Sequence, residues 1–205
     1  KVIDQNAFYA TGITSIELPA SVTTIADAAF NGNANLSSIT VSEGNTVYDS
    51  RNGCNGVIET STNTLVLGCK NTVIPDGVAI IGSSAFRGCT TITSIIVPKS
   101  VTAIGANAFR NCTNLTSAII PSSVANIEAD AFLYCYNLSS ITVGRSVPFE
   151  WTSGNTFSNL ANATLYVPAG SKPAYESAVV WNEFKEIVEI ENIAFADSKV
   201  KEVCV

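Results

Sequence analysis

The chain has 205 residues, of which 46% are hydrophobic and 14% are charged, and its net charge at neutral pH is −6. This composition supplies enough apolar side chains for a folded core and differs from that of a disordered chain. The acidic balance argues against a nucleic-acid binder, which needs a basic surface for phosphates, and against docking on anionic lipid. No run of 18 apolar residues occurs, so we expect no insertion into a membrane.

A 23-residue repeat dominates the sequence. The pair Ala-Phe recurs at 85–86, 108–109 and 131–132 within the pattern I-P-x-x-V-x-x-I-x-x-x-A-F-x-x-C-x-x-(L/I). A proline column and a cysteine column keep the same step: Pro75, Pro98, Pro121, Cys89, Cys112 and Cys135. Further copies occupy 18–36, the start of the chain and, in degenerate form, 138–160. Self-similarity at this period predicts a solenoid, whose units bury their apolar faces by stacking.

Each copy contains a short stretch such as ITSIIVP at 92–98, with apolar residues at its first, fourth and sixth positions. This spacing is the strand signature of leucine-rich repeats. Alternation at period 2 points Ile95 inward and its neighbours Ser94 and Ile96 outward. The proline that follows ends the strand, because it has no N–H to donate. The rest of each unit is too short for a full helix, so we expect brief turns and a second short extended piece.

The phenylalanine of each Ala-Phe pair is expected to fill the core. Stacking would then join the rings into one aromatic ladder: Phe8, Phe30, Phe86, Phe109, Phe132 and Phe157. We interpret the cysteine column as buried, reduced and inert thiols, because the chain has no histidine to activate them and no paired C-x-x-C spacing for zinc. The lack of histidine also excludes a Ser-His-Asp triad, and no Gly-rich phosphate loop occurs. We therefore expect no enzyme, no metal site and no cofactor.

An insertion at about 43–71 interrupts the repeat. Within it, GVIET and TLVLG flank a polar STN turn, which predicts a β-hairpin. Cys54 and Cys69 lie near the two ends of this hairpin and are absent from the repeat pattern. They form either a disulfide or a pair of reduced, buried thiols, and the sequence leaves both alternatives open.

A C-terminal cap at about 163–190 is expected to close the solenoid. Ser171 and Pro173 predict the start of a short helix, with Ser171 as N-cap, and FKEIVEI predicts a last strand. We expect residues 1–190 to form one domain and residues 191–205 to be a linker or the start of a further domain.

Two groups of side chains are candidates for binding a partner. The first group occupies outward strand positions: Ser94, Ile96, Ser117, Ile119, Ser140, Thr142 and Tyr166. Val73 extends the apolar column that Ile96 and Ile119 form within this group. The second group is an aromatic patch, in which tyrosines replace the polar residues of other repeats: Tyr134, Tyr136, Phe149 and Trp151. Each group has a structural alternative, because hydroxyls stabilise a solvated strand face and aromatic residues can pack an irregular repeat.

The unit I-P-x-x-V-x-x-I-x-x-x-A-F-x-x-C-x-x-L resembles the BspA-like leucine-rich repeat family of bacterial surface proteins over about residues 1–190. The resemblance implies a leucine-rich-repeat solenoid that is secreted or displayed at the cell surface. It also implies a non-enzymatic binding or adhesion module for host or neighbouring-cell proteins or glycans. The alternative is a structural spacer that displays another functional domain of a larger surface protein.

Overall fold

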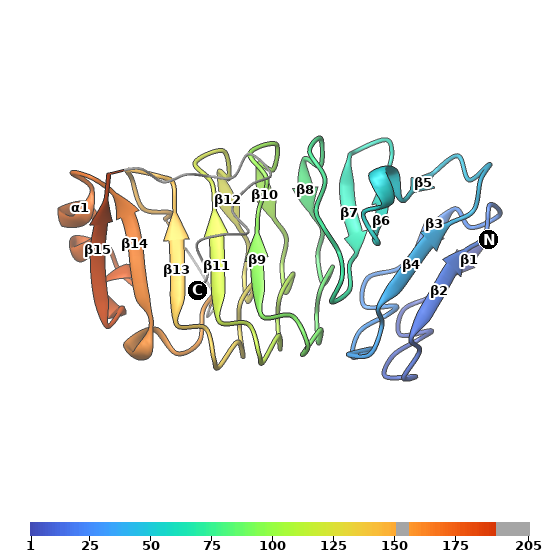
Figure 1. Ribbon diagram of the computed structural model, residues 1–205, viewed down its shortest axis with the longest axis horizontal. Helices are drawn as coiled ribbons and strands as arrows, with labels where there is room; N and C mark the ends of the chain where they lie inside the picture. Colours follow the sequence, from blue (N-terminus) through green and yellow to red (C-terminus); the bar gives the residue numbers. More distant parts are fainter. Residues whose placement is uncertain (151–155, 192–205) are drawn as a thin grey trace.

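The computed structural model describes residues 1–150 and 156–191. The chain winds into an elongated solenoid of about eight turns, with the N-terminal repeats at one end and the cap at the other (Figure 1). Each turn contributes short strands that stack in parallel on the strands of its neighbours. The predicted leucine-rich-repeat solenoid is therefore confirmed.

A first ladder of parallel strands runs along one side of the solenoid. Its longer part has the order β15 (Glu186–Ile190), β14 (Thr164–Pro168), β13 (Ser140–Val143), β11 (Ser117–Ile120) and β9 (Ser94–Ile96). Its shorter part pairs β2 (Ser15–Leu18) with β4 (Ser38–Val41). Pro19 and Pro121 directly follow β2 and β11, as expected for a residue that cannot continue the hydrogen-bond ladder.

A second ladder is built from two-residue strands, the second extended pieces predicted for each repeat. They are β1 (Val2–Ile3), β3 (Thr24–Ile25), β8 (Ile80–Ile81), β10 (Ala103–Ile104) and β12 (Asn126–Ile127). The Ala-Phe segments between the ladders are turns rather than helices. In the turn around Phe109, Asn107 and Asn111 have left-handed φ values of +58° and +63°. Asn and Gly suit such positions because they tolerate this conformation best.

The insertion adds β5 (Tyr48–Asp49), the 3-10 turn η1 (Arg51–Gly53), β6 (Val57–Glu59) and β7 (Thr64–Leu67). β6 and β7 pair antiparallel, which confirms the predicted hairpin. β7 then pairs in parallel with β8. The insertion is therefore part of the second ladder and lies between the N-terminal repeats and the central ones (Figure 1).

The buried side chains form two clusters instead of one continuous core. In the first, Phe8 stacks on Phe30 with ring centroids 4.9 Å apart. In the second, each ring of the central repeats stacks on the next at 5.0–5.1 Å, in the order Phe86, Phe109, Phe132 and Phe157. The prediction of a single aromatic ladder was wrong, because the insertion separates Phe30 from Phe86.

The cap contains η2 (Leu160–Asn162), the helix α1 (Lys172–Ser177), η3 (Trp181–Glu183) and the predicted last strand, β15. Ser171 precedes α1 as expected, but its hydroxyl donates to the carbonyl of Pro168 and makes no capping bond. Trp181 is fully buried and donates from Nε1 to the carbonyl oxygen of Phe149, 3.2 Å away. No helix among the described residues is long and apolar enough to cross a membrane.

Candidate functional site

The outward positions of the first ladder align in register as two columns. The polar column consists of Ser94, Ser117, Ser140 and Thr164, and the mixed column of Ile96, Ile119, Thr142 and Tyr166. Ile96 is 40% exposed, whereas most of its column neighbours are partly buried. Parallel strands lie about 4.8 Å apart, so the polar column repeats a hydroxyl at that spacing, while the mixed column changes from isoleucine to threonine and tyrosine along the ladder. The surface can therefore offer hydrogen bonds and apolar contact side by side to an extended partner.

Val73 was expected to continue the apolar column formed by Ile96 and Ile119. It is 73% exposed, as a contact residue would be. However, it lies outside the strands, and its N–H donates to the carbonyl of Cys54 in the insertion, 3.0 Å away. The register of the ladder thus pairs Ile96 with Ile119 and does not include Val73.

Tyr134 and Tyr136 of the predicted aromatic patch are exposed and lie together, with ring centroids 5.8 Å apart. The guanidinium of Arg110, from the preceding turn, lies 5.0 Å from the centre of the Tyr134 ring. Arg110 also forms an ion pair with Asp130 at 3.0 Å, which holds it in place. The patch is therefore two tyrosines and a cation, a combination that is common at protein interfaces. The sequence analysis missed Arg110, although its position next to the Ala-Phe pair one repeat earlier could have indicated the contact.

The backbone of Tyr134 is left-handed, with φ +65°. The equivalent residues of the two preceding turns are Asn111 and Gly88, which tolerate this conformation. A bulky aromatic residue there is strained and costs on the order of 1 kcal/mol.

Phe149 does not belong to the surface patch, which corrects the prediction. Its side chain is buried in the cap, 5.9 Å from Trp181 between ring centroids, with the guanidinium of Arg145 4.8 Å from its ring centre. An apolar ring is more stable there than in water, and the cap supplies the partners that the repeat pattern could not show. Trp151 lies outside the described residues.

The cysteine column is buried, as predicted. Desolvation raises the pKa of the Cys89 thiol to about 12 and raises that of Cys112 well above its ordinary value, with a further contribution from the neighbouring Cys135. A thiol that stays protonated is a poor nucleophile and a poor metal ligand. These groups therefore stabilise the core and carry no chemistry near neutral pH.

Cys54 and Cys69 are both free and buried, so the structure shows the reduced alternative and no disulfide between them. They belong to different core clusters on the two sides of the insertion. The Cys54 thiol donates to the carbonyl of Gly56 at 3.6 Å, and the Cys69 sulfur accepts from the Asn55 amide at 3.3 Å. Burial raises the pKa of Cys54 as well. Within residues 1–150 and 156–191, no three His, Cys, Asp or Glu side chains are grouped as a metal ion would require.

The sequence matches the family described as "BspA type Leucine rich repeat region" in six copies, over residues 1–54 and 58–178. The chain belongs to this BspA-type leucine-rich repeat family. Membership indicates a repeat-based protein-interaction module, and solenoids of this family are typically non-catalytic. No curated protein is similar enough to match the chain.

Solved structures of bacterial leucine-rich repeat proteins share the fold. A leucine-rich repeat protein from Eubacterium ventriosum is 20% identical, with a TM-score of 0.60 over 88% of this chain and 49% of its own. A leucine rich cell surface protein from Faecalibacterium prausnitzii is 25% identical, with a TM-score of 0.54 over 95% of this chain and 52% of its own. The pneumococcal vaccine antigen PcpA is 16% identical, with a TM-score of 0.55 over 88% of this chain and 56% of its own. The chain thus spans about half the length of these proteins.

Proposed function

We propose that the protein is an extracellular binding module whose first strand ladder contacts proteins or glycans of a host or of neighbouring cells. The in-register columns on β9, β11, β13 and β14 carry this proposal. A rigid row of hydroxyls beside a row of mostly apolar side chains suits an extended ligand. The ligand becomes ordered on binding, whereas the solenoid is already rigid and loses little conformational entropy. Ser94, Ile96, Ser117, Ile119, Ser140, Thr142 and Tyr166 form the proposed contact face.

Display outside the cell is part of the same proposal. The similarity to the Faecalibacterium prausnitzii cell surface protein, together with the bacterial family, supports it. The acidic net charge of −6 fits a partner with basic or neutral contact groups better than nucleic acid or anionic lipid.

Tyr134 and Tyr136 are proposed as an anchor beside this face. They are 38% and 57% exposed, and the Arg110 guanidinium adds a fixed positive charge next to the rings. Aromatic residues and arginine are enriched among the few residues that dominate binding energy. The backbone strain at Tyr134 supports the same role.

The test compares two double substitutions with the same spacing on different ladders. Ile96→Glu with Ile119→Glu places two charges on the proposed face, whereas Thr102→Glu with Ala125→Glu places them beside the strands of the second ladder, where both residues are exposed. Binding of the purified chain is measured against panels of extracellular-matrix proteins and glycan arrays. The first variant should lose binding at least tenfold, because a charge must be desolvated at the contact, and the second should keep it.

Equal binding by both variants would contradict the proposed face. No binding to either panel would contradict the module itself and favour the structural spacer. Replacing Tyr134 and Tyr136 by alanine tests the anchor separately, since this variant leaves the strand columns unchanged.

A further inference from the structure

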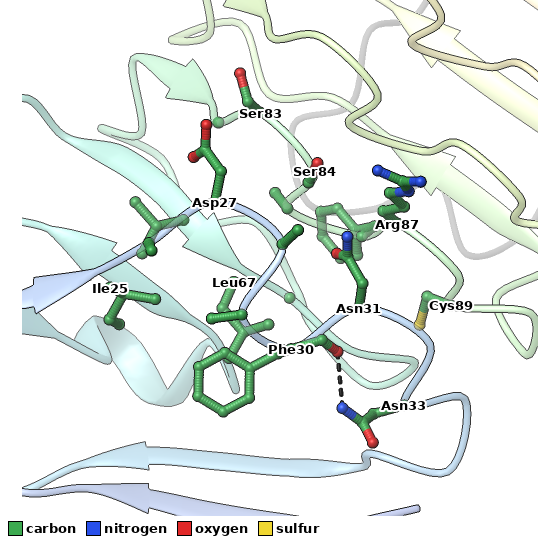
Figure 2. A pocket seen from close by; sticks show the side chains of 18 of the residues that line it. Ile25, Asp27, Phe30, Asn31, Asn33, Leu67, Ser83, Ser84, Arg87 and Cys89 are labelled. Carbon is green, nitrogen blue, oxygen red and sulfur yellow. Dashed lines mark hydrogen bonds between the residues drawn. The ribbon is translucent and has the colours of Figure 1, made fainter. Parts of the chain in front are cut away.

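The insertion opens a pocket between the N-terminal and central repeats. In regular turns the N–H of the core phenylalanine donates to an alanine carbonyl of the next turn, as Phe109 does to Ala131 at 2.8 Å. At the insertion it is Gly68, and not Phe30, that donates to Ala85, at 2.9 Å. A Cβ on Gly68 would collide with the Phe86 ring, so only glycine fits there. The displaced turn leaves a pocket of about 140 Å³ between the two clusters (Figure 2).

Beside the pocket the regular contact between turns persists, since the N–H of Gly32 donates to the carbonyl of Arg87 at 3.4 Å. Phe30 and Leu67 line the apolar part of the pocket, and Asp27, Ser83, Ser84, Asn31 and Arg87 line its polar part. The pocket thus combines apolar and polar side chains, which is the general composition of small-molecule sites.

Asn31 is the decisive residue of this pocket. It is only 6% exposed, yet its side-chain amide forms no hydrogen bond with any residue of 1–150 or 156–191. Figure 2 shows this amide directed toward Ser84 and Arg87. The amide atoms are not fully enclosed by protein, because the residue lines the pocket, where water or a ligand can reach them. A ligand in the pocket would supply the missing partners.

The neighbouring Asn33 shows the contrast. It is equally buried, but its amide nitrogen donates to the carbonyls of Phe8 and Phe30 at 2.6 and 2.8 Å, and its oxygen accepts from the N–H of Gly12 at 3.0 Å. The hydrogen bonds of Asn33 hold two turns together. Asn31 has no such structural task for its side chain.

Arg87 and Asp27 also lack partners among the described residues, and they lie on opposite sides of the pocket (Figure 2). At the equivalent position of the next turn, Arg110 is paired with Asp130 at 3.0 Å. The pocket therefore offers a donor-only guanidinium, an acceptor-only carboxylate and an amide that does both.

The carboxylate, the guanidinium and the amide together determine which kind of ligand the pocket can bind. An anionic ligand would meet the carboxylate of Asp27, and a cationic ligand would meet the guanidinium of Arg87. A hydroxyl both donates and accepts, so a ligand with several hydroxyls can bond all three groups at once. The volume is close to the roughly 150 Å³ of a cavity that holds benzene, so it accommodates one six-membered ring, and part of the hydroxyl groups of a sugar would lie at the open side of the pocket.

We propose that this pocket binds one neutral pyranose residue, with its hydroxyls on Asp27, Asn31 and Arg87 and its C–H face on Phe30 and Leu67. This site is separate from the strand face and does not depend on the function proposed above. A free sugar or the end of a glycan chain would present the same chemistry.

The test uses the 205-residue chain with glucose, galactose, mannose and N-acetylglucosamine as probes. Saturation-transfer NMR detects binding of the free sugars, and a glycan array detects binding of chain ends. We expect binding of at least one neutral sugar, and about tenfold weaker binding for Asn31→Ala and Arg87→Ala, since each loses a hydrogen bond to the ligand. Lys99→Ala, which removes an exposed positive charge outside the pocket and the proposed contact face, should bind like the parent chain.

Stability separates a ligand-binding Asn31 from a structural one. Asn31→Ala should unfold at about the same denaturant concentration as the parent chain, because it removes no hydrogen bond of the fold, whereas Asn33→Ala loses the bonds to Phe8, Phe30 and Gly12 and should unfold at a lower one. Destabilisation of both variants to the same degree would overturn the proposal. So would the absence of binding to every neutral sugar in both assays, binding of acidic sugars alone, or binding that Asn31→Ala and Arg87→Ala leave unchanged. The double variant Ile96→Glu with Ile119→Glu should bind the sugars normally. This outcome separates sugar binding in the pocket from partner binding at the strand face.

Discussion

The Sγ atom of Cys112 donates a hydrogen bond to the carbonyl oxygen of Phe86, 3.2 Å away and one turn earlier in the solenoid. Cys135 makes the same bond to Phe109 at 3.1 Å. Each thiol thus links its own turn to the preceding one inside the core. The column combines the packing of a small apolar residue with a weak, repeated hydrogen bond along the solenoid axis.

Cys89, Cys112 and Cys135 should not react with a thiol reagent while the chain is folded. They are buried, and desolvation keeps the Cys112 thiol protonated, whereas the reactive species is the thiolate. A Cys204→Ser background removes the cysteine in the undescribed tail. Labelling with a chromogenic disulfide, mapped by peptide mass, should find these three residues only after denaturant is added. Rapid labelling of Cys112 in the native chain would contradict this prediction.

Alkaline pH should destabilise the folded chain through its buried thiols. The pKa of Cys89 is about 12 in the folded state and about 9 in an unfolded chain, so the folded state holds its proton more tightly. The resulting stability is fully present below pH 9 and is lost as pH rises toward 12, by about 1.4 kcal/mol per pH unit for the Cys89 thiol. Urea unfolding at pH 8 and 10 should show a larger loss for the parent chain than for Cys89→Ala. Equal losses would mean that other groups dominate.

Phe109→Ala should lower the free energy of unfolding by roughly 3–5 kcal/mol, as for other fully buried phenylalanines. Its ring is stacked on both sides, at 5.1 Å from Phe86 and 5.0 Å from Phe132. Phe8→Ala should cost clearly less, because Phe8 is partly exposed and stacks on Phe30 alone within the ladder. Urea unfolding followed by circular dichroism measures both. Similar losses of unfolding free energy in the two variants would show that the position of a ring in the ladder does not determine its contribution to stability.

Asn111→Tyr should destabilise the chain by about 1 kcal/mol, because it places a bulky residue at φ +63°. The reverse change, Tyr134→Asn, relieves the strain at φ +65° and loses the contact with Arg110, which is worth about 0.5–1 kcal/mol. Its stability should therefore equal or slightly exceed that of the parent chain, while partner binding weakens. Thermal unfolding of the two variants provides the comparison. A clear loss of stability in Tyr134→Asn would indicate that the tyrosine serves the fold.

The repeat allowed much of the architecture to be predicted from the residues. The 23-residue step aligned Ser94 with Ser117 and Ile96 with Ile119, and the strands pair in that register. It also placed Cys112 inside, since a residue in one column shares the burial of its equivalents. These predictions succeeded because each contact joins positions one period apart, which a sequence alignment of the chain with itself reveals.

Predictions failed where the contacts have no such period. Phe149 resembled part of a surface patch, but it packs on Trp181, 32 residues later, in a cap that has no repeat partner. The interruption of the aromatic ladder after Phe30 depends on how β7 pairs with β8, a long-range choice set by packing and not by local pattern.

The sequence by itself determined the solenoid, the strand columns, the buried thiols and the hairpin of the insertion, because a repeated apolar pattern has one arrangement in which every unit covers the next. Only the tertiary structure decided where the insertion lies in the stack. Gly68 occupies the place next to Phe86 that the repeat would give to Phe30, and this exchange leaves a pocket lined by Asn31, Asp27 and Arg87. These side chains come from turns that are not 23 residues apart in the sequence. An alignment of the repeats therefore could not predict that they lie together.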